Sequence, residues 1–265
     1  MIDPSALLAR IERGFEAARQ ALAPFRGVAV KATSKADMSP VTAADHAVNR
    51  ALRDTLPRNG EGWLSEETAD DARRLECDSL WIIDPIDGTR EFIHNVPEWC
   101  VSIAYVHRGH ALAGGIFNPA TNEVILGATG AGVTYNGNLV TLGRRNSLNG
   151  AVVLASRSEI RRGEWTGFEN LGFEVRPLGS VAYKLGLVAA GLAEATWTLS
   201  PKNEWDVAAG AALMAAAGGV AANTDFSPPV FNQPNPRIPG FLACVPGLDS
   251  PLRQLLARHN RGHNQ

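Results

Sequence analysis

Two aspartates three residues apart follow an apolar run in segment 81–89, which reads WIIDPIDGT. The run is typical of a buried strand, so Asp84 and Asp87 should stand at the end of that strand. Pro85 stiffens the bend between them, and Gly88 permits a close approach of the backbone. Carboxylates bind cations and free N–H groups bind phosphate, a combination that suits phosphoryl chemistry. The alternative is a plain turn, because Asp, Pro and Gly are common turn residues.

Three further acids stand in patterns of their own. Glu66 is the first acid of the Ser-Glu-Glu triplet 65–67, eighteen residues before the first of the paired aspartates. Asp206 opens an Ala-rich stretch, and Asp45 closes the sequence Thr-Ala-Ala-Asp. Each acid also has a structural explanation: a solvated loop for Glu66, the first turn of a helix for Asp206 and a capping box for Asp45.

The chemistry of these acids depends on whether they meet. If Glu66 and Asp206 joined the paired aspartates, four carboxylates would repel one another and some would take up protons. Divalent metal ions relieve that repulsion and keep the carboxylates ionised. Ligand sets made only of oxygen favour Mg²⁺ over Zn²⁺. Bound metal ions activate water and stabilise the leaving oxygen of a phosphate ester, while the protein mainly positions the groups.

Together, four segments resemble the inositol monophosphatase superfamily of lithium-sensitive, magnesium-dependent phosphatases: SPVTAAD (39–45), SEE (65–67), WIIDPIDGT (81–89) and WDVAAG (205–210). The resemblance covers about residues 31–219 and keeps the family's order of motifs. The superfamily also contains 3'(2'),5'-bisphosphate nucleotidases and fructose-1,6-bisphosphatases. The resemblance implies a layered αβαβα sandwich with the site between its two halves, and a homodimer. It also implies two or three Mg²⁺ ions and inhibition by lithium.

The resemblance implies a role for each matching residue. The implied metal ligands are Glu66, Asp84, the carbonyl oxygen of Ile86, Asp87 and Asp206. Thr89 is implied to orient the attacking water with Asp45 as its partner, and Glu66 is implied to take part in catalysis. The N–H groups of Gly88 and Thr89 are implied to hold the phosphate.

Several residues bear on which phosphate ester is cleaved. The segments SKADMSPVTAAD, LSEE and DGTREFI resemble the bisphosphate nucleotidase branch, and Ser156 and Lys184 also match that branch. Enzymes of this branch act on 3'-phosphoadenosine 5'-phosphate. Leu199 stands where the inositol branch commonly has a sugar-binding glutamate. In contrast, Gly179 and Ser180 are spaced as in the inositol branch. We expect Ser156, Gly179, Ser180 and Lys184 to contact the substrate. A bisphosphate nucleotidase is favoured, with inositol monophosphatase and histidinol-phosphate phosphatase as alternatives.

These residues need strands and helices that hold them in place. In the first half, apolar spacing predicts helices at 4–24 and 42–56. Short apolar runs between turn signals predict strands at 63–65, 80–83, 99–106, 111–117, 123–128 and 132–135. The short turns between successive strands predict an antiparallel sheet.

From about residue 150 strands and helices alternate. We expect strands at 151–156, 173–178, 195–199 and 241–245, helices at 158–170, 180–191, 204–217 and from Ser250, and a loop at 227–239. The fold class is therefore α+β followed by α/β. Residues 1–145 form an N-terminal domain with the antiparallel sheet and most metal ligands. Residues 146–265 form a C-terminal domain that supplies Asp206 and substrate contacts.

The composition excludes several partner classes. Among 265 residues, 25 are Lys or Arg and 27 are Asp or Glu, which gives a formal net charge of −2. This balance excludes a broad basic surface for a nucleic-acid polymer or an anionic membrane. The charged N-terminal segment does not fit a signal peptide, and no long apolar run predicts a spanning helix. Cys77, Cys100 and Cys244 lack metal or redox spacing, so we interpret them as buried thiols of a cytoplasmic protein.

Two protein classes other than a phosphatase fit parts of this pattern. The carboxylates could form a structural cation site in a binding module, but such a module has no need of Thr89, Asp45 and free N–H groups beside its metal. A dinucleotide-binding domain would need a G-x-G-x-x-G sequence after a strand, which the chain lacks. The sequence therefore favours an enzyme that acts on a small phosphorylated substrate.

Overall fold

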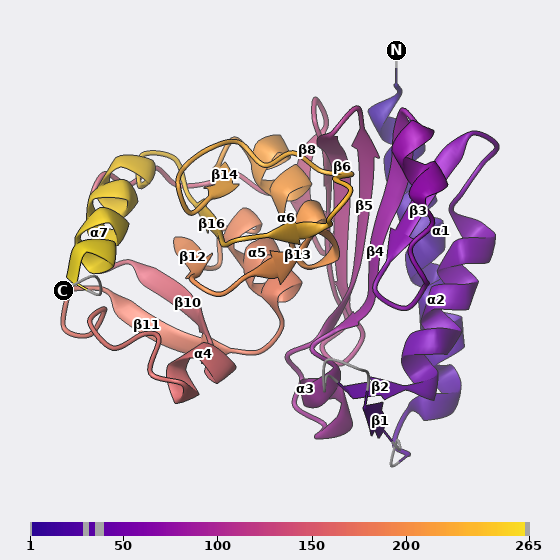
Figure 1. Ribbon diagram of the computed structural model, residues 1–265, viewed down its shortest axis with the longest axis horizontal. Coiled ribbons are helices and arrows are strands. Elements are labelled where there is room, and N and C mark those ends of the chain that lie inside the picture. The colour runs from indigo at the N-terminus through magenta and orange to yellow at the C-terminus, as the bar shows by residue number, and fades with distance from the viewer. Residues whose placement is uncertain (1, 29–31, 35–39, 263–265) are drawn as a thin grey trace.

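The computed structural model of the chain describes residues 2–28, 32–34 and 40–262. Layers of helices and sheets alternate across the molecule (Figure 1). The αβαβα sandwich expected from the sequence is confirmed. Ser39 and the other residues of 35–39, which belong to motifs quoted above, lie outside the described residues.

A seven-stranded sheet carries the two paired aspartates. Its strand order is β3-β4-β5-β6-β7-β8-β9. Neighbours from β4 onward are antiparallel, as predicted, whereas β3 is parallel to β4. The strands are β3 (Glu61–Ser65), β4 (Ser79–Asp87), β5 (Cys100–His107), β6 (His110–Asn118), β7 (Glu123–Ala128), β8 (Gly132–Tyr135) and β9 (Asn138–Leu139).

Helices α1 (Pro4–Leu22) and α2 (Ala43–Thr55) cover one face of this sheet (Figure 1). Asp3 caps α1, because its carboxylate accepts a hydrogen bond from the N–H of Ser5 at 3.0 Å. Thr42 and Asp45 form the predicted capping box of α2. The apolar sides of both helices bury a core against the sheet, which fixes α2 and with it Asp45.

Helices α5 (Val181–Ala189) and α6 (Glu204–Ala217) form the layer between the two sheets (Figure 1). α6 is buried continuously from Val207 to Met214, as expected for a helix enclosed on all sides. Its small side chains let it lie close to β6. A Cβ atom placed on Gly114 would overlap the main-chain carbonyl of Ala209. This close contact holds the first turn of α6 beside the end of β4.

A five-stranded sheet forms the next layer. Its order is β11-β10-β12-β16-β14. β10 (Val152–Ser156) is parallel to β11 (Glu174–Leu178) and to β12 (Ala195–Thr198). β16 (Phe241–Cys244) is antiparallel to β12 and to β14 (Val220–Asn223). The outer helix α7 (Asp249–Gly262) packs on this sheet through Leu252 and Leu256.

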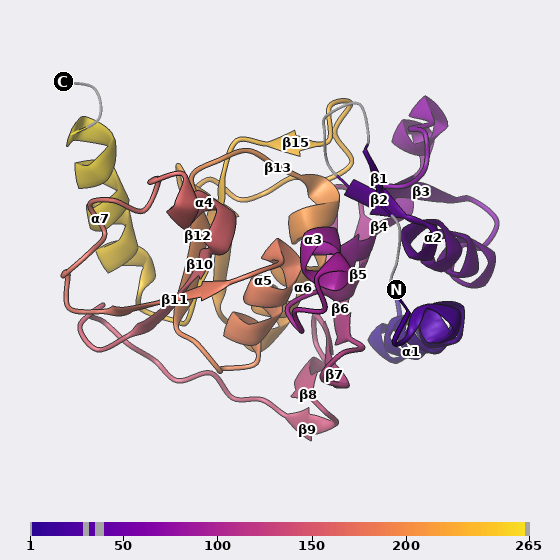
Figure 2. The ribbon, with the colours of Figure 1, turned by 90° about the horizontal axis from the view of Figure 1, so that it is seen from below.

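Short elements complete the fold. β1 (Ala32–Ser34) pairs with β2 (Pro40–Thr42), and β13 (Lys202–Asn203) pairs with β15 (Arg237–Ile238). Short helical turns are η1 (Ala23–Phe25), η2 (Ala72–Glu76), α3 (Thr89–Ile93) and α4 (Arg157–Arg161). Figure 2 shows α3 between the β1–β2 pair and α5. The segments that surround the site thus come from both sheets.

The helix predicted for 158–170 is wrong beyond its first residues. α4 has only five residues, and the chain then turns at Gly163 and Gly167, both at positive φ. These turns direct Trp165 and Phe168 into the core under α7. Burial of two large aromatic side chains therefore overrides local helix propensity here.

Three further points need correction. The loop predicted for 227–239 contains β15, whose pairing with β13 could not be read from its composition. The sequence pattern also missed β14. Cys100 and Cys244 are buried free thiols as expected, but Cys77 is only partly buried because it follows the surface turn η2.

The chain passes from the seven-stranded to the five-stranded sheet between Leu139 and Val152. We propose that 1–145 and 146–265 are two lobes, as the sequence led us to expect. They share one core, because α5 and α6 contribute side chains that pack with residues of both sheets. None of the described helices combines the length and the apolarity that crossing a bilayer requires.

Gly114→Ala should destabilise the protein by about 1–3 kcal/mol, because the added methyl group must displace the backbone of α6. Thermal and urea denaturation would measure the loss. Gly143→Ala is the matched control, since a Cβ atom there meets no atom within 4 Å. Equal stability of the two variants would contradict the close contact between β6 and α6.

Candidate active site

The end of β4 departs from regular strand geometry. Its pairing with β5 is interrupted between Asp84 and Asp87. In a regular strand, residues three apart face opposite sides, so the interruption is what allows both carboxylates to face the same space. The N–H of Ile86 donates a hydrogen bond to the Asp84 carboxylate at 3.1 Å and holds this bend.

The first turn of α6 carries the third aspartate. The N–H of Asn203 donates to the carboxylate of Asp206 at 2.7 Å, and these residues form a capping box. The helix-cap explanation and the metal-ligand prediction are compatible, because the same carboxylate faces β4. One carboxylate oxygen from each of Asp84, Asp87 and Asp206 lies within 4.8 Å of the others. Tertiary packing therefore brings together the three aspartates that the sequence singled out.

Glu66 completes the acidic group. It directly follows β3, and its N–H donates to the carbonyl of Ile83 on β4 at 3.3 Å. Glu66 lines the same cavity of about 250 Å³ as the three aspartates. Its charge contributes to raising the pKa of Asp84 and of Asp206. The solvated-loop explanation of Glu66 therefore does not hold.

Asp84 and Asp206 are too crowded to ionise freely. Asp84 is only 1% exposed, and burial, followed by the charges of Glu66 and Asp87, raises its pKa well above the usual range. Burial and the charge of Asp87 raise the pKa of Asp206 to about 8. Without a cation, protons would occupy such groups at neutral pH. A compact group of buried carboxylate oxygens is the donor set that Mg²⁺ or another hard divalent cation prefers.

Thr89 lies beside this group and contacts Asp45. Its Oγ1 is 3.2 Å from the carboxylate of Asp45 and 3.0 Å from the carbonyl oxygen of Ile86. The other Asp45 oxygen accepts hydrogen bonds from the N–H and the hydroxyl of Thr42, at 2.8 and 2.6 Å. Burial raises the pKa of Asp45. When the hydroxyl of Thr89 donates its hydrogen bond to Asp45, its lone pairs are free to accept a hydrogen bond from water.

Gly88 turns the chain from β4 into α3 in a left-handed conformation with φ 94°. A Cβ atom there would lie 3.0 Å from the carbonyl oxygen of Glu98 and 3.0 Å from Cβ of Trp99. The position therefore requires glycine. Gly88 and Thr89 both line the cavity, and N–H groups that open a helical turn have no acceptor within it.

The four predicted substrate contacts, Ser156, Gly179, Ser180 and Lys184, all line the cavity. Ser156 also caps α4, since its Oγ accepts from the N–H of Glu159 at 3.4 Å. The N–H of Gly179 is already engaged, because it donates to the carboxylate of Glu98 at 2.7 Å. These residues therefore combine a structural function with a position at the cavity wall.

Ser180 links α5 to the acidic group. Its φ of 54° is unusual for a residue with a side chain. Its hydroxyl donates to the carboxylate of Asp87 at 2.7 Å, and the N–H of Ala182 donates to the same oxygen at 2.5 Å. Lys184 is 3% exposed, and its Nζ donates to the carbonyl of Ser180 at 2.6 Å. Burial lowers the pKa of Lys184 to about 8 against the opposing charge of Asp87.

Several residues of the cavity escaped the sequence reasoning. Lys202 lies at the wall, with Nζ 3.2 Å from the fully buried carboxylate of Glu159. Arg90, Glu91 and Arg161 line the cavity as well. The signal for Lys202 was weak: it lies four residues before Asp206 and therefore near the start of the helix that carries it. Arg90 and Glu91 lie in the quoted segment DGTREFI, but no role was assigned to them, and Arg161 had no signal because exposed arginines are common on any surface.

Comparison with known proteins identifies relatives along most of the chain. A sequence model described as the inositol monophosphatase family matches residues 6–252. An inositol-1-monophosphatase of Rhizobium meliloti is 31% identical over 196 residues, which cover 70% of this chain and 72% of that protein. A 3'-phosphoadenosine 5'-phosphate phosphatase of Mycobacterium leprae is 35% identical over 76% of both chains. The solved structure of the inositol monophosphatase from Anabaena (Nostoc) sp. PCC 7120 has a TM-score of 0.76 at 25% identity and covers 97% of each chain.

Magnesium should stabilise the protein more strongly as the pH rises from about 6 to 8. The pKa of Asp206 is raised from its ordinary value of 3.8 to about 8 in the folded protein. The metal-free protein therefore loses stability as the pH rises from about 3.8 to about 8. A bound cation compensates the ionised carboxylates and prevents that loss. Thermal denaturation with Mg²⁺ or with chelator across this pH range would measure the difference in Tm.

The matched variants are Asp206→Asn, which removes one of the titrating groups, and Asp54→Asn, which changes an exposed aspartate on α2. The Tm difference between Mg²⁺ and chelator should change less with pH in Asp206→Asn than in the wild type. In Asp54→Asn it should change with pH as in the wild type. A difference in Tm that is the same at every pH would contradict the crowding of carboxylates described above.

Proposed function

The chain belongs to the inositol monophosphatase family and is a phosphatase, and from this premise we propose that it is a Mg²⁺-dependent phosphomonoester hydrolase of the 3'(2'),5'-bisphosphate nucleotidase type. The substrate would be 3'-phosphoadenosine 5'-phosphate, cleaved to AMP and phosphate. The proposal rests chiefly on the convergence of Asp84, Asp87 and Asp206 within 4.8 Å. Because the chain belongs to a family of phosphatases, a cation-binding module without enzymatic activity is no longer an alternative.

We assign the metal ligands as follows. The carboxylates of Glu66, Asp84, Asp87 and Asp206 and the carbonyl oxygen of Ile86 would hold two or three Mg²⁺ ions. The raised pKa values of Asp84 and Asp206 support this assignment, because they mark oxygens whose charge the protein alone does not balance. When bound, such ions supply an activated water and stabilise charge on the phosphate oxygens.

The residues around the acidic group would then position the reacting groups. Thr89 would accept a hydrogen bond from the attacking water while it donates to Asp45, whose other oxygen is held by Thr42. Glu66 would help to orient the same water. The N–H groups of Gly88 and Thr89 would hold phosphate oxygens at the turn into α3. Phosphate esters need little more than such positioning and charge stabilisation.

Two observations favour a bisphosphate nucleotide over an inositol phosphate. The Mycobacterium leprae relative named for 3'-phosphoadenosine 5'-phosphate matches this chain over 76% of its length. Leu199 packs against the C-terminal core and is not among the residues that line the cavity, so no carboxylate at this position meets a sugar hydroxyl. Inositol monophosphatase remains the second candidate because of the Rhizobium meliloti relative. Histidinol-phosphate phosphatase is the third. We also propose a homodimeric, cytoplasmic enzyme that lithium inhibits.

A comparison of substrates tests this proposal. At millimolar Mg²⁺, kcat/KM should be highest for 3'-phosphoadenosine 5'-phosphate, followed by inositol 1-phosphate and histidinol phosphate. Chelation should abolish phosphate release, and lithium should inhibit it. A higher kcat/KM for inositol 1-phosphate would replace the nucleotide assignment, and no hydrolysis of any of the three would contradict phosphomonoester hydrolysis at this site.

Removing a residue that only hydrogen-bonds to a metal ligand lowers activity roughly 10–100-fold. Asp87→Asn should lower kcat by more than this, because Asp87 is proposed to bind the metal itself. The fold should survive, because the amide oxygen of asparagine can still accept the hydrogen bonds of Ser180 and Ala182. Phosphate release and thermal denaturation would be measured together. Asp54→Asn is the control for loss of a carboxylate elsewhere, and near-normal turnover of Asp87→Asn would contradict its assignment as a ligand.

A further inference from the structure

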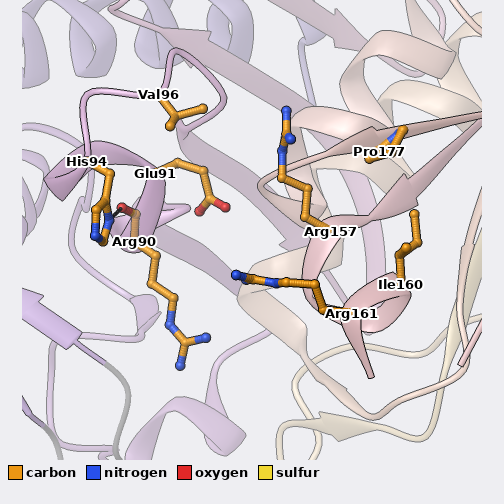
Figure 3. A pocket seen from close by; sticks show the side chains of 8 residues that line it. All are labelled: Arg90, Glu91, His94, Val96, Arg157, Ile160, Arg161 and Pro177. Atoms are coloured by element: carbon orange, nitrogen blue, oxygen red, sulfur yellow. Dashed lines mark hydrogen bonds between the residues drawn. The ribbon is translucent and has the colours of Figure 1, made fainter. Parts of the chain in front are cut away.

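A cleft of about 690 Å³ opens beside the acidic cavity, between α3 and α4 (Figure 3). α3 follows β4 of the seven-stranded sheet, and α4 follows β10 of the five-stranded sheet. The residues that line both the cleft and the acidic cavity include Arg90, Glu91, Arg157 and Arg161. A ligand can therefore occupy both spaces at once.

Two arginines of this cleft have no partner among the residues that the structure describes. Within the described part of the chain, no hydrogen bond or ion pair engages the guanidinium group of Arg90 or of Arg161. Figure 3 shows the Arg161 side chain extending from α4 toward Arg90 and Glu91. In contrast, Arg157 is neutralised by two hydrogen bonds to the carboxylate of Glu98, one of them at 2.8 Å. The free positive charge of the cleft therefore comes from Arg90 and Arg161.

The remaining lining suits the carbon scaffold of a small molecule. Val96, Ile160 and Pro177 give the cleft a nonpolar part. The carboxyl group of Glu91 lies at the boundary with the acidic cavity, where it can accept a hydrogen bond from a hydroxyl group of such a scaffold. The volume exceeds what one phosphate group fills and falls in the range of pockets for small organic ligands.

We propose that Arg90 and Arg161 bind a second phosphate group of the substrate while the first is cleaved at the carboxylates. A small organic bisphosphate, such as the nucleotide proposed above, would then place one phosphate group in the acidic cavity and the other in the cleft. This proposal rests on the phosphatase function proposed above. Its physical basis is the fit of guanidinium groups to phosphate oxygens, which they bind through paired, charge-assisted hydrogen bonds.

Matched substrate pairs that differ only in the second phosphate test the proposal. Adenosine 3',5'-bisphosphate is compared with adenosine 3'-monophosphate, and fructose 1,6-bisphosphate with fructose 1-phosphate. The wild-type enzyme should prefer the bisphosphate of at least one pair. In the variant Arg90→Gln/Arg161→Gln, kcat/KM should fall about 10–100-fold more for the bisphosphate than for the matched monophosphate, chiefly through KM.

Arg162→Gln is the matched control. It removes the same charge one residue from Arg161, but Arg162 is paired with Glu164 at 2.6 Å and does not line the cleft. The control should keep the wild-type preference. No preference for either bisphosphate in the wild type, or an unchanged preference in the double variant, would overturn the second phosphate site and leave the phosphatase function intact. An equal loss on mono- and bisphosphates would overturn it too.

A binding measurement separates this proposal from the proposed function. In chelator the acidic cavity repels anions, so adenosine 5'-monophosphate should bind at the arginines alone. Calorimetry should detect binding to the wild type and to Arg162→Gln, and a loss of affinity in Arg90→Gln/Arg161→Gln. Equal binding by all three proteins, or none by the wild type, would overturn the site. The result does not depend on turnover, so an inactive enzyme would contradict only the proposed function.

Discussion

Mutual repulsion of buried carboxylates is the constraint on which the site depends. Asp84, Asp87 and Asp206 hold oxygens within 4.8 Å of one another, and Glu66 lines the same small cavity. Crowding of this kind raises pKa values and makes the metal-free folded state costly at neutral pH. A protein tolerates such an arrangement when bound cations remove the cost. The acidic group is therefore both the proposed active site and a place where the metal-free fold loses stability as its carboxylates ionise.

The surrounding structure holds the carboxylates in place against that repulsion. α6 lies close to β6 because Gly114 has no side chain, and this fixes the turn that carries Asp206. Gly88 and Ser180 adopt positive φ angles on either side of Asp87. Ser180 and Ala182 donate hydrogen bonds to Asp87, so the two halves of the molecule meet at a predicted metal ligand.

The charge of the molecule is arranged locally rather than globally. The net charge of −2 does not indicate an anionic substrate. The acidic group attracts cations, whereas the neighbouring cleft presents the guanidinium groups of Arg90 and Arg161. These charges come from opposite sides of the cleft, on α3 and α4. Such an arrangement suits a small ligand with more than one phosphate group better than an extended polyanion.

The sequence by itself determined the local features: the Asp3 and Thr42 caps, most strands, and the acids at strand and helix ends. Such features depend on residues close together in the chain, as does the family resemblance carried by the four motifs. Only the tertiary structure decided that Glu66 and Asp206, 140 positions apart, face one cavity. The helix predicted for 158–170 is short in the structure, because Trp165 and Phe168 pack into a core whose other side is formed by α7. Arg157 is paired with Glu98, which lies far away in sequence and close in space, whereas Arg161 has no partner in the described part of the chain. Only the tertiary structure decides between these two outcomes.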